Sequence, residues 1–430
     1  MRVTMFTNTY LPHVGGVANS VKQFTDGYRQ RGHDVLVVAP TYEEDHPEGE
    51  GENVVRVPAL KNIQESNFSL ALPTTPKLKR ALDGFQPELI HSHHPYIIGD
   101  TALRFAASEE LPLVFTYHTM YEHYTHYSPV APEQLKEFIK ELATGYANLC
   151  SCVIAPSESV AEILRERGVR TPIRVIPTGV EVERFEEGDG ESVRAEYGIP
   201  DSAPVIGYLG RLAEEKNLDF LSRALAAYLE GDDSAHVLVV GGGEAMADIE
   251  DVFQRRDMSE RLHMTGELTG QEVIDAYHAM DVFAFSSLTE TQGMALAEAL
   301  AAGCPVVALD APGAREIVRT GKNGILVEEE DEGEFAEALS SVLQKLDREG
   351  RKFADRCRKS VENYRSERCV GRALDLYREL LEGKEPSLPE WEEAMSRVPE
   401  TLTQEANIWL NRLRALARAS TRGNGLELEQ

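Results

Sequence analysis

Two glutamates lie close together in a stretch that also carries a glycine. The stretch SSLTETQGMALAEALAAGCPVVAL runs from Ser286 to Leu309, with Glu290 before Gly293 and Glu298 after it. A pair of carboxylates suggests general acid/base chemistry on a sugar or a phosphate. Neighbouring acids on a helix are, however, more often a solvated face. The pair indicates a site only if other parts of the chain supply companions.

Two cations in the same half of the chain are such companions. The segment GRLAEEKN follows the apolar run PVIGYL and offers Arg211 and Lys216, the two cations that a diphosphate needs. Glu290 is expected in the loop after the run DVFAFSS, and Glu298 in the next helix, whose N-terminus can receive a phosphate. The two glutamates are then left for hydroxyl groups, Glu290 for the sugar and Glu298 for the ribose.

Glycines also open a helix near the start of the chain. In TNTYLPHVGGVANSVKQF, Gly15 and Gly16 follow the first apolar run, where a flexible turn can bring backbone N–H groups close to phosphate oxygens. The stretch lacks the G-x-G-x-x-G spacing of a dinucleotide fold, so taken alone it favours a plain strand-to-helix turn.

A histidine and several aromatic residues follow a strand of the first half. A histidine among aromatic residues is more often core, but the place of His118 at the carboxyl end of the strand favours a site. The next aromatic and histidine residues either line a ligand site or pack: Tyr121, His123, Tyr124, His126 and Tyr127.

The elements that must position these residues are short strands between helical segments. Apolar, β-branched runs such as DVLVVAP and HVLVVGGG alternate with helix-length stretches, which predicts two doubly wound parallel α/β sheets. Ligands of such sheets bind outside the carboxyl ends of the strands. We expect one domain over residues 1–179, a second over 180–365, a helix over 366–383 and a helical tail over 384–430.

Length and composition fit soluble domains. The 430 residues suffice for two domains of about 100 to 200 residues, and 42% of the residues are hydrophobic. No apolar run approaches the roughly 18 residues that span a bilayer, and MRVTMFTNTY lacks the core of a signal peptide, so a cytoplasmic location is expected. The five scattered cysteines indicate neither a disulfide framework nor a zinc site.

The charge is strongly acidic. The net charge is −28, and the 44 basic residues comprise 12 lysines and 32 arginines. A surface rich in carboxylates and poor in lysine indicates adaptation to salt and a halophilic source. The same acidic field argues against nucleic acid as a partner.

The C-terminal segment EANIWLNRLRALARASTR is amphipathic and basic. Trp409, Leu410, Leu413, Leu416 and Ala417 recur at helical spacing beside Arg412, Arg414, Arg418 and Arg422. Such a helix either lies on an anionic membrane or packs back on the N-terminal domain. A lipid substrate would favour the membrane, with the protein peripheral on its inner face.

Taken together, these motifs resemble a known family. GGV in the first loop, GRLAEEKN, and the two glutamates of ETQGMALAE followed by AAGCPVVA are similar to the retaining nucleotide-sugar glycosyltransferases of the GT4 type. The resemblance covers residues 1–383 and implies two facing Rossmann-like domains, the GT-B architecture, with a C-terminal helix that crosses back. TNTYLPHVGGVANS, TYHTMYEHYTHY and ETQG further resemble the branch that glucosylates diacylglycerol. Gln292, where the wider family more usually has an aromatic residue, points the same way.

The resemblance implies roles for individual residues. Residues 1–179 would form the acceptor domain and 180–365 the nucleotide-sugar domain. His118 would border the reacting sugar, Arg211 and Lys216 would neutralise the diphosphate, and Glu290 would bind a sugar hydroxyl without forming a covalent intermediate. The donor would further be held by Gly15, Gly16, Gly293, Met294, Ala295 and Glu298, and the acceptor by Tyr121, Tyr124 and Tyr127.

The expected reaction needs neither a cofactor nor a metal. No D-x-D motif lies in a suitable loop, so Arg211 and Lys216 would replace the metal used elsewhere. The resemblance implies transfer of a hexose from a UDP- or GDP-hexose to the hydroxyl of a diacylglycerol-like or archaeal ether lipid, with retention of configuration. A glycan or soluble sugar as acceptor, a sugar-nucleotide 2-epimerase and a non-enzymatic sensor remain the alternatives.

Overall fold

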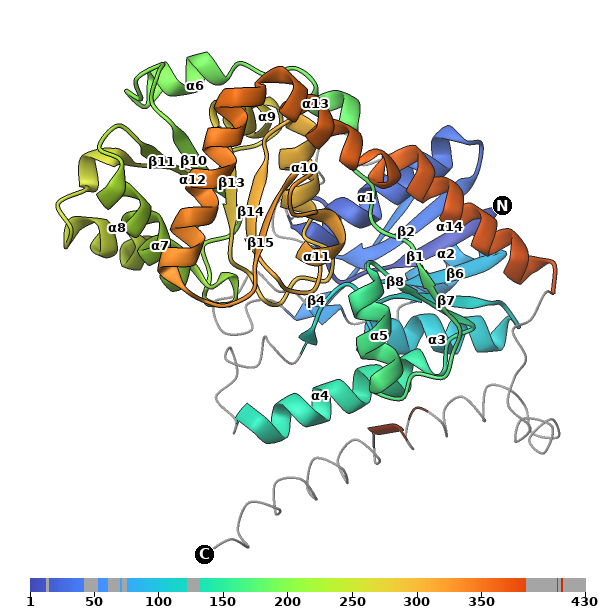
Figure 1. The fold of residues 1–430 in the computed structure, drawn as a ribbon. Helices are drawn as coiled ribbons and strands as arrows, with labels where there is room; N and C mark the ends of the chain where they lie inside the picture. Colours follow the sequence, from blue (N-terminus) through green and yellow to red (C-terminus); the bar gives the residue numbers. More distant parts are fainter. Residues whose placement is uncertain are drawn as a thin grey trace, which may run out of the picture. The chain divides into compact units, whose positions relative to one another are not determined.

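A computed structural model describes residues 1–12, 15–41, 53–60, 70–71, 76–121, 132–383, 408 and 411–412. The chain forms two compact units (Figure 1). The first unit comprises Met1–Thr178 together with Glu367–Gln430, and the second comprises Gly179–Ser366. Among the described residues, no helix is long and apolar enough to cross a membrane.

The first unit is built on a parallel sheet with the strand order β3-β2-β1-β6-β7-β8-β9. The order reverses between β1 and β6, so the loops after these two strands open at a topological switch point, where ligands of such sheets bind. A short antiparallel pair, β4 and β5, lies apart from this sheet in the hydrogen-bonding pattern. The strands are β1 Arg2–Phe6, β2 Asp34–Pro40, β3 Val54–Val57, β4 Ala59–Leu60, β5 Leu70–Ala71, β6 Leu89–Ser92, β7 Leu113–Thr116, β8 Cys152–Ala155 and β9 Ile173–Val175.

Alternate residues of these strands enter two different cores, as the period of two requires. Val3 and Met5 of β1 pack beneath α1 and α14, whereas Phe6 faces the core that α2, α3, α4 and α5 cover. The helices are α1 Gly16–Gln30, α2 Pro76–Phe85, α3 Ile98–Ser108, α4 Pro132–Ala147, α5 Glu158–Glu166 and α14 Ser366–Leu381. Because α14 follows the whole second unit in sequence yet packs on this sheet, it is the helix predicted to cross back.

The second unit contains a six-stranded parallel sheet in the order β12-β11-β10-β13-β14-β15. Its order reverses between β10 and β13, so the loops that begin at Gly210 and Ser286 open at its switch point. The strands are β10 Val205–Leu209, β11 His236–Val240, β12 Leu262–Gly266, β13 Val282–Phe285, β14 Val306–Leu309 and β15 Gly324–Val327.

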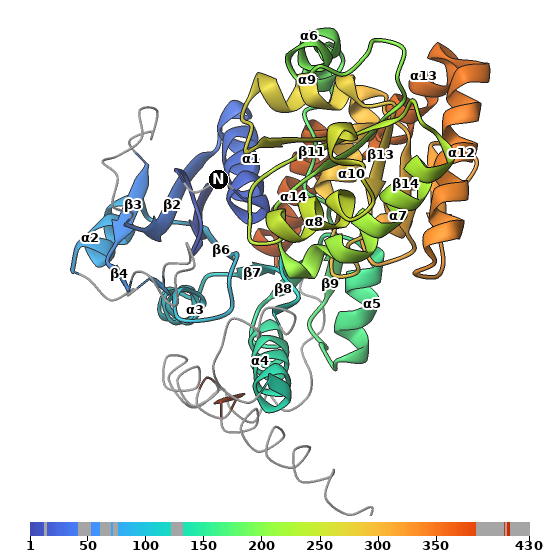
Figure 2. The same cartoon turned by 90° about the vertical axis from the view of Figure 1, so that its left-hand side faces the viewer.

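Helices cover this second sheet around one continuous core. Helix α7 packs with α8 and α12, and α10 packs with α9 and α13 (Figure 2). The helices are α6 Gly190–Glu196, α7 Leu218–Gly231, α8 Met246–Gln254, α9 Gln271–Ala279, α10 Met294–Ala302, α11 Ala314–Ile317, α12 Glu332–Glu349 and α13 Arg351–Ser360, with 3₁₀ turns at Val182–Phe185, Glu214–Lys216, Ser259–Arg261 and Glu362–Tyr364. The predicted pair of doubly wound parallel sheets is confirmed.

Candidate active site

The loop after β10 carries Arg211 and Lys216, and two glycines of the loop after β11 pack directly against its backbone. A Cβ atom on Gly241 would lie 1.9 Å from the carbonyl oxygen of Gly210, and one on Gly243 would lie 2.1 Å from that of Leu212. Both glycines also have positive φ angles, 137° and 151°. Only glycine therefore lets the loop after β11 approach so closely.

The loop after β13 is bound to the same segment through hydroxyl groups. Ser286 Oγ donates to the carbonyl oxygen of Lys216 at 2.9 Å, and Ser287 Oγ and Thr289 Oγ1 each donate to that of Glu215 at 3.3 Å. Three side chains thus fasten one loop of the switch point to the other. This arrangement fixes Lys216 and Glu290 relative to each other.

Lys216 and Glu290 form an ion pair in this position. Lys216 Nζ lies 2.5 Å from Glu290 Oε1, and each side chain is only 18% exposed. Burial raises the pKa of Glu290, but the charge and hydrogen bond of Lys216, with help from Ser287 and Arg211, outweigh it, so the pKa is lowered. Glu290 is therefore an anion at neutral pH. The two residues that the sequence singled out separately are brought into direct contact.

Arg211 has a different partner. Its guanidinium pairs with Glu215, whose side chain is almost completely buried, while Arg211 itself is about half exposed at 49%. The hydroxyl of Tyr208 donates to the carbonyl oxygen of Arg211 at 3.2 Å. Arg211 thus pairs with a buried carboxylate, while about half of its own side chain remains exposed.

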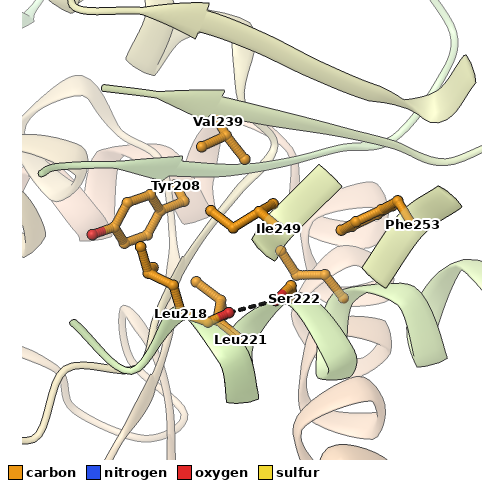
Figure 3. A pocket seen from close by; sticks show the side chains of 8 residues that line it. Tyr208, Leu218, Leu221, Ser222, Val239, Ile249 and Phe253 are labelled. Atoms are coloured by element: carbon orange, nitrogen blue, oxygen red, sulfur yellow. Dashed lines mark hydrogen bonds between the residues drawn. The ribbon is translucent and has the colours of Figure 1, made fainter. Parts of the chain in front are cut away.

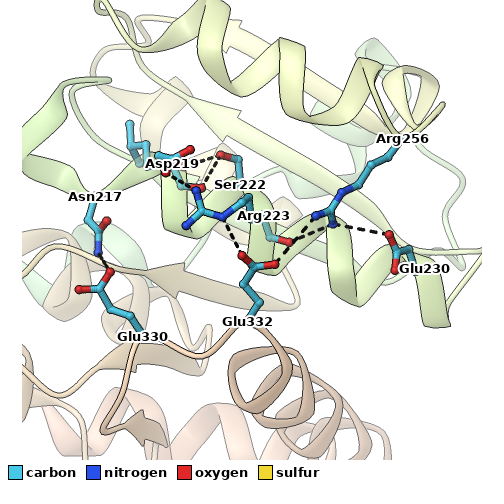
Figure 4. Close-up of polar contacts among 9 residues, drawn as sticks. Asn217, Asp219, Ser222, Arg223, Glu230, Arg256, Glu330 and Glu332 are labelled. Atoms are coloured by element: carbon cyan, nitrogen blue, oxygen red, sulfur yellow. Dashed lines mark hydrogen bonds and ion pairs between the residues drawn. The ribbon is translucent and has the colours of Figure 1, made fainter.

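An ion network lies behind this loop on α7 and α12 (Figure 4). Arg223 contacts both Asp219 and Glu332, and Arg256 lies 3.9 Å from Glu332. Asn217, the residue after Lys216, donates to Glu330 at 3.2 Å. The network connects the first turn of α7 to the start of α12 and supports the loop from the side.

Helix α10 begins at the predicted phosphate position. Its N-cap, Gly293, has φ 72° and no side chain that could cap the first turn, so the backbone N–H groups at Met294 and Ala295 suit an anion. The preceding Gln292 is buried, and its Nε2 donates to Met294 Sδ at 3.3 Å. A Cβ on Gly313 would lie 2.9 Å from that of Glu290, so a second glycine gives this loop its room.

Glu298 lies on α10 in surroundings unlike those of Glu290. Its Oε2 accepts a hydrogen bond of 3.0 Å from the hydroxyl of Tyr277 on α9. Burial raises the pKa of Glu298, and the Tyr277 hydrogen bond and the charge of Arg184 offset this only in part. Sequence reasoning missed Tyr277, because no pattern connects it with a residue one helix further on.

The first unit has a helix N-terminus after β1. Helix α1 begins at Gly16, its N-cap Gly15 has no side chain that could cap it, and a Cβ atom on Gly16 would meet none of the described residues within 4 Å. Gly15 has the extended φ of 171°, which any residue adopts. The space beside Gly16 fits the predicted approach of a ligand, although steric exclusion of a side chain does not require glycine there.

Histidines gather at the carboxyl ends of β6 and β7. His118 Nε2 lies 2.9 Å from Nδ1 of His93, and the ring of His91 contacts that of His93 in a tilted arrangement with centroids 4.1 Å apart. His94 Nδ1 accepts from the backbone N–H of Asn8 in the loop after β1 at 3.1 Å. Burial lowers the pKa values of His91, His94 and His118 to about 3, so these rings are neutral. The available signal was the H-x-H-H spacing at the end of a strand, which the sequence analysis did not use.

The aromatic residues proposed for the acceptor are described only in part. Tyr121 packs its ring against Tyr96 and Tyr117, with centroids 5.1 and 5.9 Å away. Tyr124 and Tyr127 lie outside the described residues, as do His123 and His126.

The described part of the tail packs on the first unit. Ile408 is 3% exposed, and Asn411 Nδ2 donates to the carbonyl oxygen of Leu142 at 3.1 Å. Arg412 pairs with Asp100 of α3, as expected if this segment packs on the N-terminal domain, and its role at a membrane stays a prediction. The other residues named for that face lie outside the described residues.

Two cavities differ in character. The first lies in the core of the second unit between Tyr208, Ile249 and Phe253 (Figure 3) and holds about 10 Å³, which is a packing void. The second, of about 290 Å³, lies between α3, α4 and the docked tail residues, with Tyr96 and Phe138 in its largely apolar wall. Neither contains Lys216 or His118.

In the described part of the chain, potential metal ligands are dispersed and the cysteines are buried. No three or more His, Cys, Asp or Glu side chains there are grouped so that they could hold a metal ion. All five cysteines are buried and free, and burial raises the pKa of Cys152 to about 11 and that of Cys357 to about 12.

Two Rossmann-like units, with a helix N-terminus at each switch point and with Arg211 and Lys216 at the second, form the architecture of GT-B glycosyltransferases. Two family models match the chain, Glycosyltransferase Family 4 over residues 14–184 and Glycosyl transferases group 1 over residues 203–345. The chain belongs to glycosyltransferase family 4 and is a nucleotide-sugar-dependent enzyme.

Curated relatives of the chain have several activities. The alpha-monoglucosyldiacylglycerol synthase of Streptococcus pneumoniae is 30% identical over 346 residues, which are 79% of this chain and 78% of that protein. A GDP-mannose-dependent alpha-mannosyltransferase of Mycobacterium tuberculosis is 31% identical over 371 residues, 84% of this chain and 92% of its own.

Solved structures share the fold. The sucrose-phosphate synthase of Thermosynechococcus elongatus superposes with a TM-score of 0.71 at 22% identity, covering 89% of this chain and 99% of that one. Anabaena HepE in complex with UDP-glucose gives 0.69 at 20% identity, over 87% and 100% of the two chains.

Proposed function

We propose that this glycosyltransferase moves a hexose from a UDP- or GDP-hexose to the hydroxyl of a lipid acceptor, with retention of configuration. The observation that carries the proposal is the Lys216–Glu290 pair at the switch point of the second unit. A fixed cation and a fixed anion side by side suit a substrate that has a diphosphate next to a sugar.

The charges of these residues support a role for each of them in the reaction. Lys216 and Arg211 stabilise the negative charge that develops on the departing nucleoside diphosphate, together with the N-terminus of α10. Glu290, kept anionic by Lys216, accepts a hydrogen bond from a sugar hydroxyl. Glu298 accepts one from the ribose. His118 contributes a neutral ring at the edge of the reacting sugar.

The acceptor hydroxyl attacks from the face that the diphosphate leaves. The bond from the anomeric carbon to the diphosphate oxygen breaks, the bond to the acceptor oxygen forms, and the hydroxyl proton passes to the diphosphate. No side chain becomes covalently attached to the sugar.

A lipid acceptor is supported by two relatives named alpha-monoglucosyldiacylglycerol synthase, from Streptococcus pneumoniae and Acholeplasma laidlawii. The enzyme would then act at the inner face of the membrane as a peripheral protein. A soluble acceptor is the second candidate, because the relatives also include D-inositol 3-phosphate glycosyltransferases.

Product analysis tests the proposal. The protein is incubated with UDP-glucose, UDP-galactose or GDP-mannose and with diacylglycerol, an archaeal ether lipid or inositol 3-phosphate, and products are identified by mass spectrometry and by the NMR coupling of the anomeric proton. A lipid glycoside with the donor's anomeric configuration is expected. Transfer only to inositol 3-phosphate, or an inverted product, would refute the corresponding part.

A further inference from the structure

His93 and His118 form a close pair at the end of two neighbouring strands of the first unit. His93 is 0% exposed, its ring stacks on that of His118 at 23° with centroids 5.1 Å apart, and its Nδ1 lies 2.9 Å from His118 Nε2. His93 comes directly after β6, whose loop opens at the switch point of the first unit. The buried ring therefore supports a residue that we place beside the substrate.

His91 has a fixed hydrogen-bonding role of its own. Tyr28 Oη donates to Tyr377 Oη at 3.1 Å, which leaves Tyr377 to donate to His91 Nδ1 at 2.6 Å. His91 Nε2 then carries the proton and donates to Thr116 Oγ1 at 2.7 Å. Both nitrogens of His91 are thus hydrogen-bonded, and its neutral ring packs against that of His93.

The proton between His93 and His118 can be assigned in the same way. Nε2 of His93 is buried and has no hydrogen-bond partner among the described residues. If His118 donated, His93 would carry a buried N–H without an acceptor, and orphaned buried N–H groups are rarer than unpaired acceptors. His93 Nδ1 is therefore the donor, His118 Nε2 is the acceptor, and His118 carries its own proton on Nδ1.

We propose that His93 is a positioning residue, which fixes the ring of His118 and its tautomer, with the proton on Nδ1, beside the reacting sugar. This inference rests on the proposed function, which places His118 at the reacting sugar.

The second unit supplies a matched control. His236 Nδ1 lies 2.9 Å from His263 Nε2, and these rings stack at 28° with centroids 5.1 Å apart. His236 is the first residue of β11 and His263 is the second of β12. Both therefore lie near the amino ends of their strands, whereas the candidate site follows the carboxyl ends. The same pair geometry therefore occurs where no substrate is expected.

The test compares His93→Leu, His93→Asn and His236→Leu in the full-length enzyme. Leucine removes the donor, whereas the amide nitrogen of asparagine takes the place of imidazole Nδ1. His93→Leu should lower kcat on the order of 10- to 100-fold, as misplacement of a reacting group does, with an unchanged KM for the nucleotide sugar. His93→Asn should recover most of kcat, and His236→Leu should leave it unchanged.

A spectroscopic readout is independent of activity. With ¹⁵N-labelled histidine, His118 should show a pyrrole-type Nδ1 and a pyridine-type Nε2, and this pattern should be lost in His93→Leu. Wild-type kcat in His93→Leu, or a proton on Nε2 of His118, would overturn the inference. If the wild-type enzyme forms no glycoside, the proposed function fails while the tautomer still decides the role of His93. If His93→Leu does not fold, His93→Asn and the wild-type tautomer decide it.

Discussion

Replacing Lys216 tests the donor site most directly. At about 4 Å and an effective dielectric near 20, two unit charges interact by about 4 kcal/mol. Loss of a group aimed at developing charge costs about 2.7–4 kcal/mol, or 10² to 10³ in kcat. Lys216→Met should reach the upper part of this range, because Glu290 would then repel the departing diphosphate without compensation.

The same substitution should reduce stability, because Glu290 is only 18% exposed and loses its partner. The double variant Lys216→Met/Glu290→Gln should therefore regain thermal stability but not turnover. Arg194 and Asp281 provide the control, since they form another ion pair of this unit at 2.8 Å with 12% and 32% exposure. Arg194→Met should lower the melting temperature without changing kcat. Near-normal turnover in folded Lys216→Met would refute the assignment.

Three further predictions concern other parts of the molecule. Because the pKa of Glu298 is raised, its negative charge destabilises the folded state above the folded-state pKa and has no such effect below the unfolded-state pKa. Glu298→Gln should therefore raise the melting temperature more at pH 8 than at pH 4, and an equal rise at the two pH values would contradict this. Gly243→Ala should lower the free energy of unfolding, measured by chemical denaturation, by about 1–3 kcal/mol and should lower kcat, because its Cβ would meet the carbonyl of Leu212. Gly242→Ala should lower the free energy of unfolding less, because its Cβ would meet only the flexible side chain of a glutamate. Removal of residues 404–430 should weaken sedimentation with anionic liposomes and leave nucleotide binding intact; unchanged sedimentation would assign the tail a structural role alone.

Sequence predicted the sheets and the loops better than the contacts between loops. Apolar runs and the strand-to-helix rhythm located both parallel sheets, since these depend on local periodicity. GRLAEEKN and ETQGMALAE were recognised as loop motifs, but the contact between Lys216 and Glu290 spans 74 positions and depends on the strand order. Nothing local indicated it.

Other contacts were missed for related reasons. Tyr277 reaches Glu298 only because α9 and α10 pack together. His93 was not singled out from the sequence, although its spacing from His91 and His94 carried a signal. Only the positive charge of Arg412 was considered from the sequence, whereas in the structure Arg412 pairs with Asp100 and the nearby Ile408 is buried. Side-chain partners follow from tertiary packing, which charge and periodicity alone do not specify.

The two glutamates that first suggested acid/base chemistry have opposite electrostatic surroundings. Glu290 faces a cation that lowers its pKa, whereas Glu298 faces a neutral phenol and remains shifted upward by burial. A general acid must carry a proton near the working pH, and Glu290 does not. Tyr277 already donates to Glu298 Oε2, which suits this carboxyl to hold a hydroxyl rather than to exchange a proton with the sugar. We therefore expect the leaving diphosphate, and neither glutamate, to take the acceptor's proton.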